Sequence, residues 1–202
     1  SDLANGWFGD NWVPVIQGKR MFKVRAAEVI MCTGALEQLS VFRNNDVPGV
    51  MLAGAASRLI RLYGVRPGDH AVVLTANDAG YACALDLVDA GVDVRAIVDL
   101  RADSAPTSMS AADAISAIPV YKNSAVYAAS ESKNHLRGVE IRDIVASGEC
   151  ADDGRLIDCD LLCMSVGFMP TYQLACQAGA TLGYDNEGAR FSIENLPSSV
   201  QI

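Results

Sequence analysis

The clearest pattern in the chain is an apolar run, a turn of small residues, a helical pattern and a second apolar run. Residues 71–75 show no polar alternation, which is typical of a strand covered on both faces. Residues 79–90 place apolar side chains at helical spacing and stop before Gly91, and residues 92–100 form the second run. These patterns predict a β-α-β unit of about 30 residues. We expect two parallel strands joined by a right-handed crossover, as in a Rossmann-like α/β fold.

Other strands are predicted on both sides of this unit. Residues 13–32 alternate apolar and polar positions around a Gly-Lys-Arg turn and predict an antiparallel β-meander. Residues 118–130 and 135–147 also predict antiparallel strands, followed by a hairpin on the Asp-Gly pair at 153–154. A further buried strand is expected over residues 159–167.

Helical patterns occur in three other segments. Residues 51–63 have helical spacing, and Gly64 is the expected C-terminal cap of that helix. A weak helix is predicted within residues 103–117, and a short one over residues 172–178.

The turn between the two parallel strands, residues 75–80, reads Thr-Ala-Asn-Asp-Ala-Gly. In a working dinucleotide turn, glycines let the backbone approach the pyrophosphate, and the helix N-terminus supplies amide donors. Here only Gly80 remains, and Asn77 places a side chain where a phosphate needs bare backbone. Asp78 favours the start of a helix, but its charge repels a pyrophosphate. The turn is therefore either a weakened nucleotide site, with Asn77 as a candidate ligand, or a fold element that has lost its ligand.

Two further positions are candidates for contacts with a nucleotide. Asp99 ends the second parallel strand, where a ribose-binding acid lies in dinucleotide folds, but a solvated strand-end carboxylate is the alternative. Arg101 would instead suggest a 2′-phosphate. Thr33 and Gly34 directly follow an apolar strand, so their backbone could touch a flat or phosphorylated ligand or simply form a turn.

Composition narrows the function classes. The 202-residue chain has a net charge of −8 and no cluster of Lys and Arg, which argues against a nucleic-acid surface. No apolar run reaches the roughly 18 residues of a membrane helix, and the first residues do not form a secretory signal. We therefore expect a cytoplasmic location. Only two histidines are present, and no Ser/His/Asp or Cys/His arrangement is recognisable, so no catalytic residue is assigned.

None of the six cysteines forms a Cys-x-x-Cys pair, so neither a zinc site nor a redox dithiol is expected. We expect all six to be reduced, buried thiols that behave as small hydrophobic residues. Cys159 and Cys163, four residues apart, are predicted to project to the same face and remain a weaker alternative pair.

Several short motifs follow one another in a distinctive order. They are Asp-Asn-Trp at 10–12, Thr-Gly-Ala-Leu-Glu at 33–37, Asn-Asp-x-Pro-Gly-Val-Met at 45–51, Tyr-Gly-Val-x-Pro-Gly at 63–68, and Asn-Asp at 77–78. In this order the chain resembles the α subunits of heterotetrameric sarcosine oxidases, from about Phe8 to about Asp185. One departure is Val166-Gly167-Phe168, where that family tends to have Gly-Gly-Trp.

The resemblance implies a fold and a domain organisation. Such α subunits belong to the two-dinucleotide-binding flavoproteins that include thioredoxin reductase, in which an NAD-type domain is inserted into an FAD-type domain. On that template residues 1–50 are part of the outer domain, residues 51–168 form the inserted domain, and residues 169–202 return toward the outer one. The glycine-rich fingerprint would lie upstream of Ser1, which implies a central fragment of a longer subunit.

The resemblance also implies an activity. Sarcosine oxidases demethylate sarcosine oxidatively to glycine with formation of hydrogen peroxide, and pass the one-carbon unit to tetrahydrofolate. The implied cofactors are NAD or FAD in the full subunit and FMN at a subunit interface, with none necessarily bound to this fragment. The implied partners are β, γ and δ subunits. Thr33 and Gly34 match the Thr-Gly motif that approaches the dinucleotide of the outer domain.

Three alternatives stay open at this point. The chain could come from a free-standing NAD(P)H-dependent flavoprotein of the disulfide reductase type, which would need a redox cysteine pair. It could come from a related α subunit that acts on opines, glycine or proline-like compounds. Independently of either, the inserted domain could be a scaffold that kept the Rossmann shape and lost its ligand.

Overall fold

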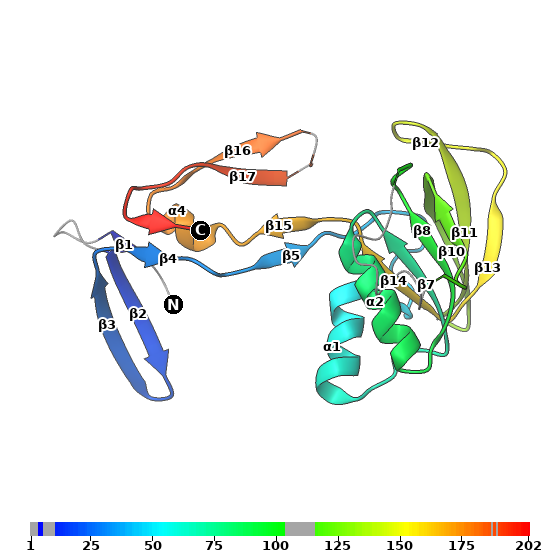
Figure 1. Ribbon diagram of the computed structural model, residues 1–202, viewed down its shortest axis with the longest axis horizontal. Coiled ribbons are helices and arrows are strands. Elements are labelled where there is room, and N and C mark those ends of the chain that lie inside the picture. The colour runs from blue at the N-terminus through cyan, green and yellow to red at the C-terminus, as the bar shows by residue number, and fades with distance from the viewer. Residues whose placement is uncertain (1–3, 6–10, 104–115, 187, 189) are drawn as a thin grey trace. The chain divides into compact units, whose positions relative to one another are not determined.

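The computed structural model describes residues 4–5, 11–103, 116–186, 188 and 190–202. The chain forms two compact units (Figure 1). One unit combines Ser1–Leu36 with Phe168–Ile202, and the other is the continuous segment Glu37–Gly167. We refer to them as the discontinuous unit and the continuous unit, and describe each by itself.

A parallel sheet forms the centre of the continuous unit. In the described residues its strand order is β6-β14-β7-β8-β9, and all neighbours run parallel. The strands are β6 (Val50–Leu52), β14 (Leu161–Ser165), β7 (His70–Thr75), β8 (Asp93–Asp99) and β9 (Val120–Lys122). The predicted β-α-β unit is present, with α2 (Asp78–Asp89) between β7 and β8.

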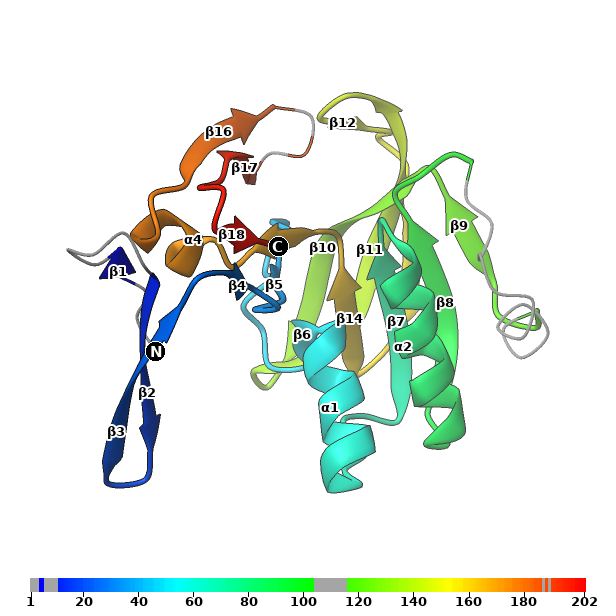
Figure 2. The ribbon, with the colours of Figure 1, turned by 60° about the vertical axis from the view of Figure 1, so that its left-hand side comes forward.

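Both faces of this sheet are covered, which explains the absence of polar alternation (Figure 2). Ala71 and Val73 of β7 pack beneath α1 (Ala53–Tyr63) and α2 in one core cluster. Val72 and Leu74 face the other side and pack against an antiparallel sheet. A fully buried Val or Leu side chain stabilises the fold by about 1.5–3 kcal/mol, so the two clusters hold the three layers together.

The antiparallel sheet contains β10 (Ser124–Ser132), β11 (His135–Ala146), β12 (Glu149–Cys150) and β13 (Arg155–Asp158). The predicted pairing of residues 118–130 with 135–147 is therefore correct for β10 and β11. Residues 120–122 instead form β9 beside β8, because Asn123 adopts a left-handed conformation with φ of 50° and turns the chain.

The hairpin predicted at residues 153–154 is wrong. β12 pairs with the distal part of β11, at Ile144 and Ala146, whereas β13 pairs with its earlier part, from Gly138 to Ile141. The two short strands therefore share β11 as a partner rather than pairing with each other. The helix expected within residues 103–117 falls largely outside the described residues.

The helix boundaries follow local signals. Gly64, with φ of 63°, ends α1 in the left-handed conformation that its C-terminal cap requires. Asn77 caps the start of α2, and Gly91 follows its end with φ of 76°.

The discontinuous unit contains the predicted meander. Strands β1 (Ala4–Asn5), β2 (Asn11–Gln17) and β3 (Arg20–Ala26) form an antiparallel sheet. Two strand pairs join the two chain segments: β4 (Val29–Ile30) with β18 (Val200–Gln201), and β5 (Ala35–Glu37) with β15 (Phe168–Pro170). A third pair, β16 (Thr181–Asp185) with β17 (Arg190–Asn195), lies within the second segment.

A small core holds this unit together. Among the described residues its buried members are Met31, Ala175, Ala178 and Val200. The short helix α4 (Gln173–Gln177), which the sequence predicts, supplies part of this core. No helix within the described ranges has the length and apolar character needed to cross a membrane.

Candidate functional site

Three strands of the parallel sheet end at the same edge. Thr75 ends β7, and it lies in register with Asp99 of β8 on one side and Ser165 of β14 on the other. All three side chains are fully buried. This edge is where an open α/β sheet binds a nucleotide, so it is the natural place to look for one.

Asn77 makes three side-chain hydrogen bonds within the fold at this edge. Its Oδ1 accepts a hydrogen bond from the backbone N–H of Ala79 at 3.0 Å, which caps α2. The hydroxyl of Ser165 donates to the same Oδ1 at 2.9 Å, and Asn77 Nδ2 donates to the Ser165 carbonyl at 3.0 Å. The Asn77 amide thus ties the start of α2 to the end of β14.

The turn matches the spacing of the dinucleotide fingerprint Gly-x-Gly-x-x-Gly, with Thr75, Asn77 and Gly80 at the three glycine positions. The Thr75 hydroxyl donates to the backbone carbonyl of Asn77 at 2.6 Å and accepts from the backbone N–H of Asn77 at 3.1 Å. A Cβ on Gly80 would lie 2.2 Å from the Thr75 Oγ1. The remaining glycine is therefore the one that allows close packing of helix on strand. Thr75 replaces the glycine of the tight turn, and Asn77 replaces the glycine that lets the backbone approach a pyrophosphate.

Asp99 is not the solvated carboxylate that the sequence left open as an alternative. It is fully buried, and its Oδ2 accepts from the Tyr81 hydroxyl at 2.8 Å and from Arg101 Nη2 at 2.9 Å. Its Oδ1 accepts from Arg101 Nε at 3.0 Å and from the Arg101 backbone N–H at 3.0 Å. A bidentate guanidinium–carboxylate pair is among the strongest hydrogen-bonded arrangements in proteins.

Arg101 connects two acidic residues. Besides the pair with Asp99, its Nη1 lies 3.4 Å from Oδ1 of Asp78, the first residue of α2. The hydrogen bonds that the Arg101 guanidinium donates to Asp99 raise the pKa of the guanidinium, so this side chain stays charged. With these two partners, Arg101 is engaged in the fold in the region where the sequence suggested a 2′-phosphate.

Thr33 and Gly34 lie in the discontinuous unit and are exposed. The Thr33 hydroxyl donates to the carbonyl of Thr171 at 3.2 Å, and the Gly34 carbonyl accepts from the Thr171 hydroxyl at 2.9 Å. Gly34 has φ of 72°, a conformation that a side chain disfavours. The Thr-Gly turn thus has a fixed backbone and an open face.

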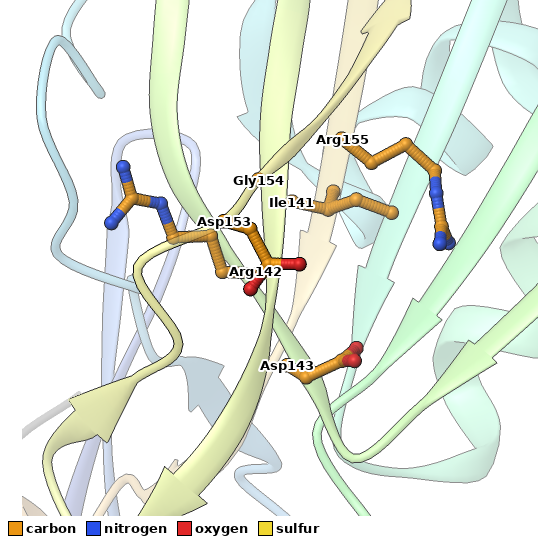
Figure 3. Close-up of a pocket in the computed structure, with 6 residues that line it drawn as sticks. All are labelled: Ile141, Arg142, Asp143, Asp153, Gly154 and Arg155. Atoms are coloured by element: carbon orange, nitrogen blue, oxygen red, sulfur yellow. The ribbon is translucent and has the colours of Figure 1, made fainter.

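A polar cavity of about 160 Å³ is lined by residues of β11, of the loop before β13 and of the start of β13 (Figure 3). In the view, the Arg142 and Arg155 guanidinium groups point away from each other. Arg142 Nε donates to Glu140 at 2.7 Å, and its guanidinium lies 3.5 Å from the centre of the Tyr127 ring. Arg155 stacks 4.8 Å from the Tyr121 ring centre. Since their charges diverge and each is already engaged, these arginines do not form a convergent anion site.

The cysteines correct two sequence expectations. All six thiols are free, but only Cys83, Cys159 and Cys163 are buried; Cys150 and Cys176 are half-buried, and Cys32 is exposed. Cys159 and Cys163 belong to different core clusters, because Cys159 precedes β14 and the strand alternation predicted for it does not apply. Burial raises the pKa of the Cys159 thiol to about 12. In the described ranges, no group of three or more His, Cys, Asp and Glu side chains is arranged to hold a metal ion.

Sequence reasoning missed Ser165 and Tyr81, the partners of Asn77 and Asp99. Ser165 ends an apolar strand far from the turn in sequence, and no local motif marks it. Tyr81 lies on the buried face of α2, where the sequence pattern predicts only a residue of the hydrophobic core. Their roles depend on which strands are neighbours in the sheet.

Comparison with known proteins supports the resemblance seen in the motifs. No known protein-family profile matches the chain. It is 34% identical over 172 residues to the α subunit of sarcosine oxidase from Corynebacterium sp. strain P-1, and 34% identical over 175 residues to that from Rhizobium meliloti strain 1021. These alignments cover 84% and 86% of the chain. The chain spans 17% and 16% of the length of these two relatives.

Solved structures show the same fold at low sequence identity. Thioredoxin reductase from T. acidophilum matches 99% of the chain, and 62% of its own, at a TM-score of 0.65 with 15% identity. L-proline dehydrogenase from P. horikoshii matches 99% of the chain, and 34% of its own, at 0.62 with 18% identity. An FAD-dependent pyridine nucleotide-disulphide oxidoreductase from Desulfovibrio vulgaris matches 86% of the chain, and 44% of its own, at 0.54 with 17% identity.

The predicted α/β fold of the disulfide reductase type, with a Rossmann-like unit, is therefore confirmed. So is the resemblance on which it was based: over most of its own length the chain is similar to the α subunits of sarcosine oxidase.

Proposed function

We propose that the chain is a central piece of the α subunit of a multi-subunit, flavin-dependent amine oxidase of the sarcosine oxidase type. The observation that carries this proposal is the 34% identity to two such subunits over most of the chain. The whole protein would take part in oxidative demethylation of sarcosine, together with β, γ and δ subunits. Its free cysteines and acidic charge are compatible with a cytoplasmic enzyme.

Within this assembly the two units are proposed to have different roles. The continuous unit corresponds to the inserted NAD-type domain and acts as a scaffold that binds no nucleotide. The bonding of Asn77 supports this, because its amide serves the helix cap and Ser165 rather than a ligand. A pyrophosphate would also approach the carboxylate of Asp78.

The discontinuous unit is proposed to be the part of an outer FAD-type domain that touches a dinucleotide. Thr33 and Gly34 are its proposed contacts, since their turn is exposed and held in place by Thr171. The dinucleotide would be NAD or FAD, with FMN held elsewhere, at an interface between subunits.

The activity is tested on the complete protein, co-expressed with the subunits encoded beside it. We expect sarcosine-dependent hydrogen peroxide formation, with little turnover of proline or opines. Turnover of proline in preference to sarcosine would replace the proposed substrate by that of a related amine dehydrogenase. Reduction of a disulfide without any amine oxidation would contradict the proposal altogether.

The division of roles is tested by dinucleotide content of the same purified complex. Gly34→Val puts a branched side chain at a positive φ and on the open face of the turn, so we expect loss of bound dinucleotide. Asn77→Ser keeps a helix-capping oxygen and is the matched change in the other unit; it should retain the full dinucleotide content. The reverse pattern would show that the turn of the continuous unit holds the nucleotide.

A further inference from the structure

The carboxylate of Asp99 is saturated by donors from the protein itself. A carboxylate offers about four acceptor positions on its two oxygens. Asp99 receives at least four hydrogen bonds: one from Tyr81, one from the backbone of Arg101 and two from the Arg101 guanidinium. In a dinucleotide fold, an acid at this position accepts instead from the ribose hydroxyls. Asp99 has no acceptor position left for them.

The same guanidinium also reaches the start of α2. Arg101 Nη1 lies 3.4 Å from Asp78, so one side chain touches the end of β8 and the first residue of the helix. In a dinucleotide fold, the ribose and the pyrophosphate lie beside these two points. The charges fit as well, because the guanidinium offsets the charge of the buried Asp99 and also attracts the half-exposed Asp78.

We propose that Arg101 is a built-in replacement for the nucleotide: its guanidinium holds β8 and α2 together and closes Asp99 to ribose hydroxyls. This inference rests on the proposed scaffold role of the continuous unit and adds the device that makes it ligand-independent. Removing the guanidinium takes one hydrogen-bond donor from each oxygen of Asp99. The two vacated acceptor positions suit the two hydroxyls of a ribose.

Thermal unfolding of the full chain tests the first half of the inference. Arg101→Ala removes the positive partner of the buried Asp99 carboxylate, so we expect the Tm to fall by about 10 °C. Arg95→Ala is the matched control on the same strand, because Arg95 pairs with the exposed Asp93. It should change the Tm by no more than about 2 °C. If Arg101→Ala melts as the wild type does, Arg101 does not hold the unit together and the inference fails.

Arg101→Lys covers the case in which the alanine variant does not fold. Lys keeps the charge but cannot form the two parallel hydrogen bonds, so we expect a Tm between those of wild type and Arg101→Ala. Combining Arg101→Ala with Asp99→Asn also removes the buried negative charge, so the Tm should fall less than in Arg101→Ala alone. A double variant as unstable as the sum of both changes would show that Arg101 does not act through Asp99.

Adenosine is the probe for the second half of the inference, that Arg101 closes Asp99 to ribose hydroxyls. At millimolar concentration it should raise the Tm of Arg101→Lys or Arg101→Ala by about 2–4 °C, whereas 2′-deoxyadenosine, which lacks the ribose diol, should not. Neither compound should affect the wild type. No adenosine effect on either variant overturns the closing role of Arg101. By contrast, stabilisation by NAD that persists in the Gly34→Val variant would overturn the scaffold role of the continuous unit, so the two failures are distinguishable.

Discussion

Gly80 is the residue at which the turn still follows the dinucleotide fingerprint. A glycine is needed there for packing of the helix on the strand rather than for binding of a nucleotide. A Cβ there would lie 2.2 Å from the Oγ1 and 2.4 Å from the Cβ of Thr75. Thr75 is fully buried, and its hydroxyl lies 3.2 Å from the carbonyl of Ser165. Because Thr75 has no room to move, helix α2 can approach β7 this closely only if residue 80 is a glycine.

We therefore predict that Gly80→Ala destabilises the chain by about 2 kcal/mol, because the added methyl group overpacks the helix–strand contact. Helix propensity alone predicts the opposite sign, a gain of about 1 kcal/mol. Urea unfolding measures the difference. Ala82→Gly, at an exposed position of the same helix, is the control and should cost about 1 kcal/mol. A more stable Gly80→Ala variant would mean that the contact relaxes.

At the same scale, the sequence singled out Asn77 and Asp99 as candidates for contacts with a nucleotide but left their partners in the fold open. The helix cap by Asn77 follows from local chemistry, since Asn is a favoured capping residue. The bonds to Ser165 and Tyr81 were out of reach of sequence reasoning, because they depend on which strand lies beside β7 and how α2 is rotated. Whether any of the candidate residues binds a nucleotide stays a prediction.

Among the elements, α1 shows how a distant residue can replace a local cap. Its N-cap residue, Leu52, makes no capping hydrogen bond with its side chain. Instead both carboxylate oxygens of Glu37 lie 3.0 Å from the backbone nitrogen of Gly54. A negative charge at this end also interacts favourably with the helix dipole. Glu37 thus supplies from another segment what the sequence before the helix lacks.

We predict that Glu37→Ala destabilises the continuous unit by about 1–2 kcal/mol and speeds amide hydrogen exchange in the first turn of α1. Glu37→Gln keeps an acceptor oxygen without the charge, so its loss should be smaller. Glu131→Ala, at an exposed position in β10, is the matched control and should have no measurable effect. Unchanged exchange in Glu37→Ala would contradict the capping role.

Elements with strong periodicity were the predictable ones. The structure places β7, α2 and β8 within about two residues of the predicted bounds, since both periodicity and flanking glycines marked them. The errors concern pairing. Residues 120–122 pair with β8 in the parallel sheet, and β12 and β13 both pair with β11. These pairings were not predictable, because short strands have too few side chains to specify a partner locally.

At the scale of the whole molecule, the two units differ in how their cores are built. The continuous unit, Glu37–Gly167, contains both large core clusters within one uninterrupted segment. The discontinuous unit is made of two segments, and four buried residues form the centre of its core in the described part of the chain. Its core has correspondingly little apolar surface to offset the entropy of ordering two segments.

We predict that residues 37–167 expressed alone fold into a cooperative unit with a single thermal transition. Circular dichroism in the far and near ultraviolet would show retained secondary structure and fixed aromatic packing. Residues 1–36 joined to 168–202 by a flexible linker are the companion sample, and we expect them not to unfold cooperatively. Loss of the near-ultraviolet signal from residues 37–167 would show that the continuous unit depends on the rest of the chain.

The sequence by itself determined the β-α-β unit, the meander and the order of motifs that points to sarcosine oxidase α subunits. These features are local, or are strung along the chain, so periodicity and motif order suffice to find them. Only the tertiary structure decided what surrounds the turn at residues 75–80. It brought Ser165 to Asn77, because two strands distant in sequence end at one edge of the sheet. It placed Tyr81 on Asp99, because Tyr81 lies on the buried face of α2. The chemistry of that edge depends on neighbours that no local pattern specifies.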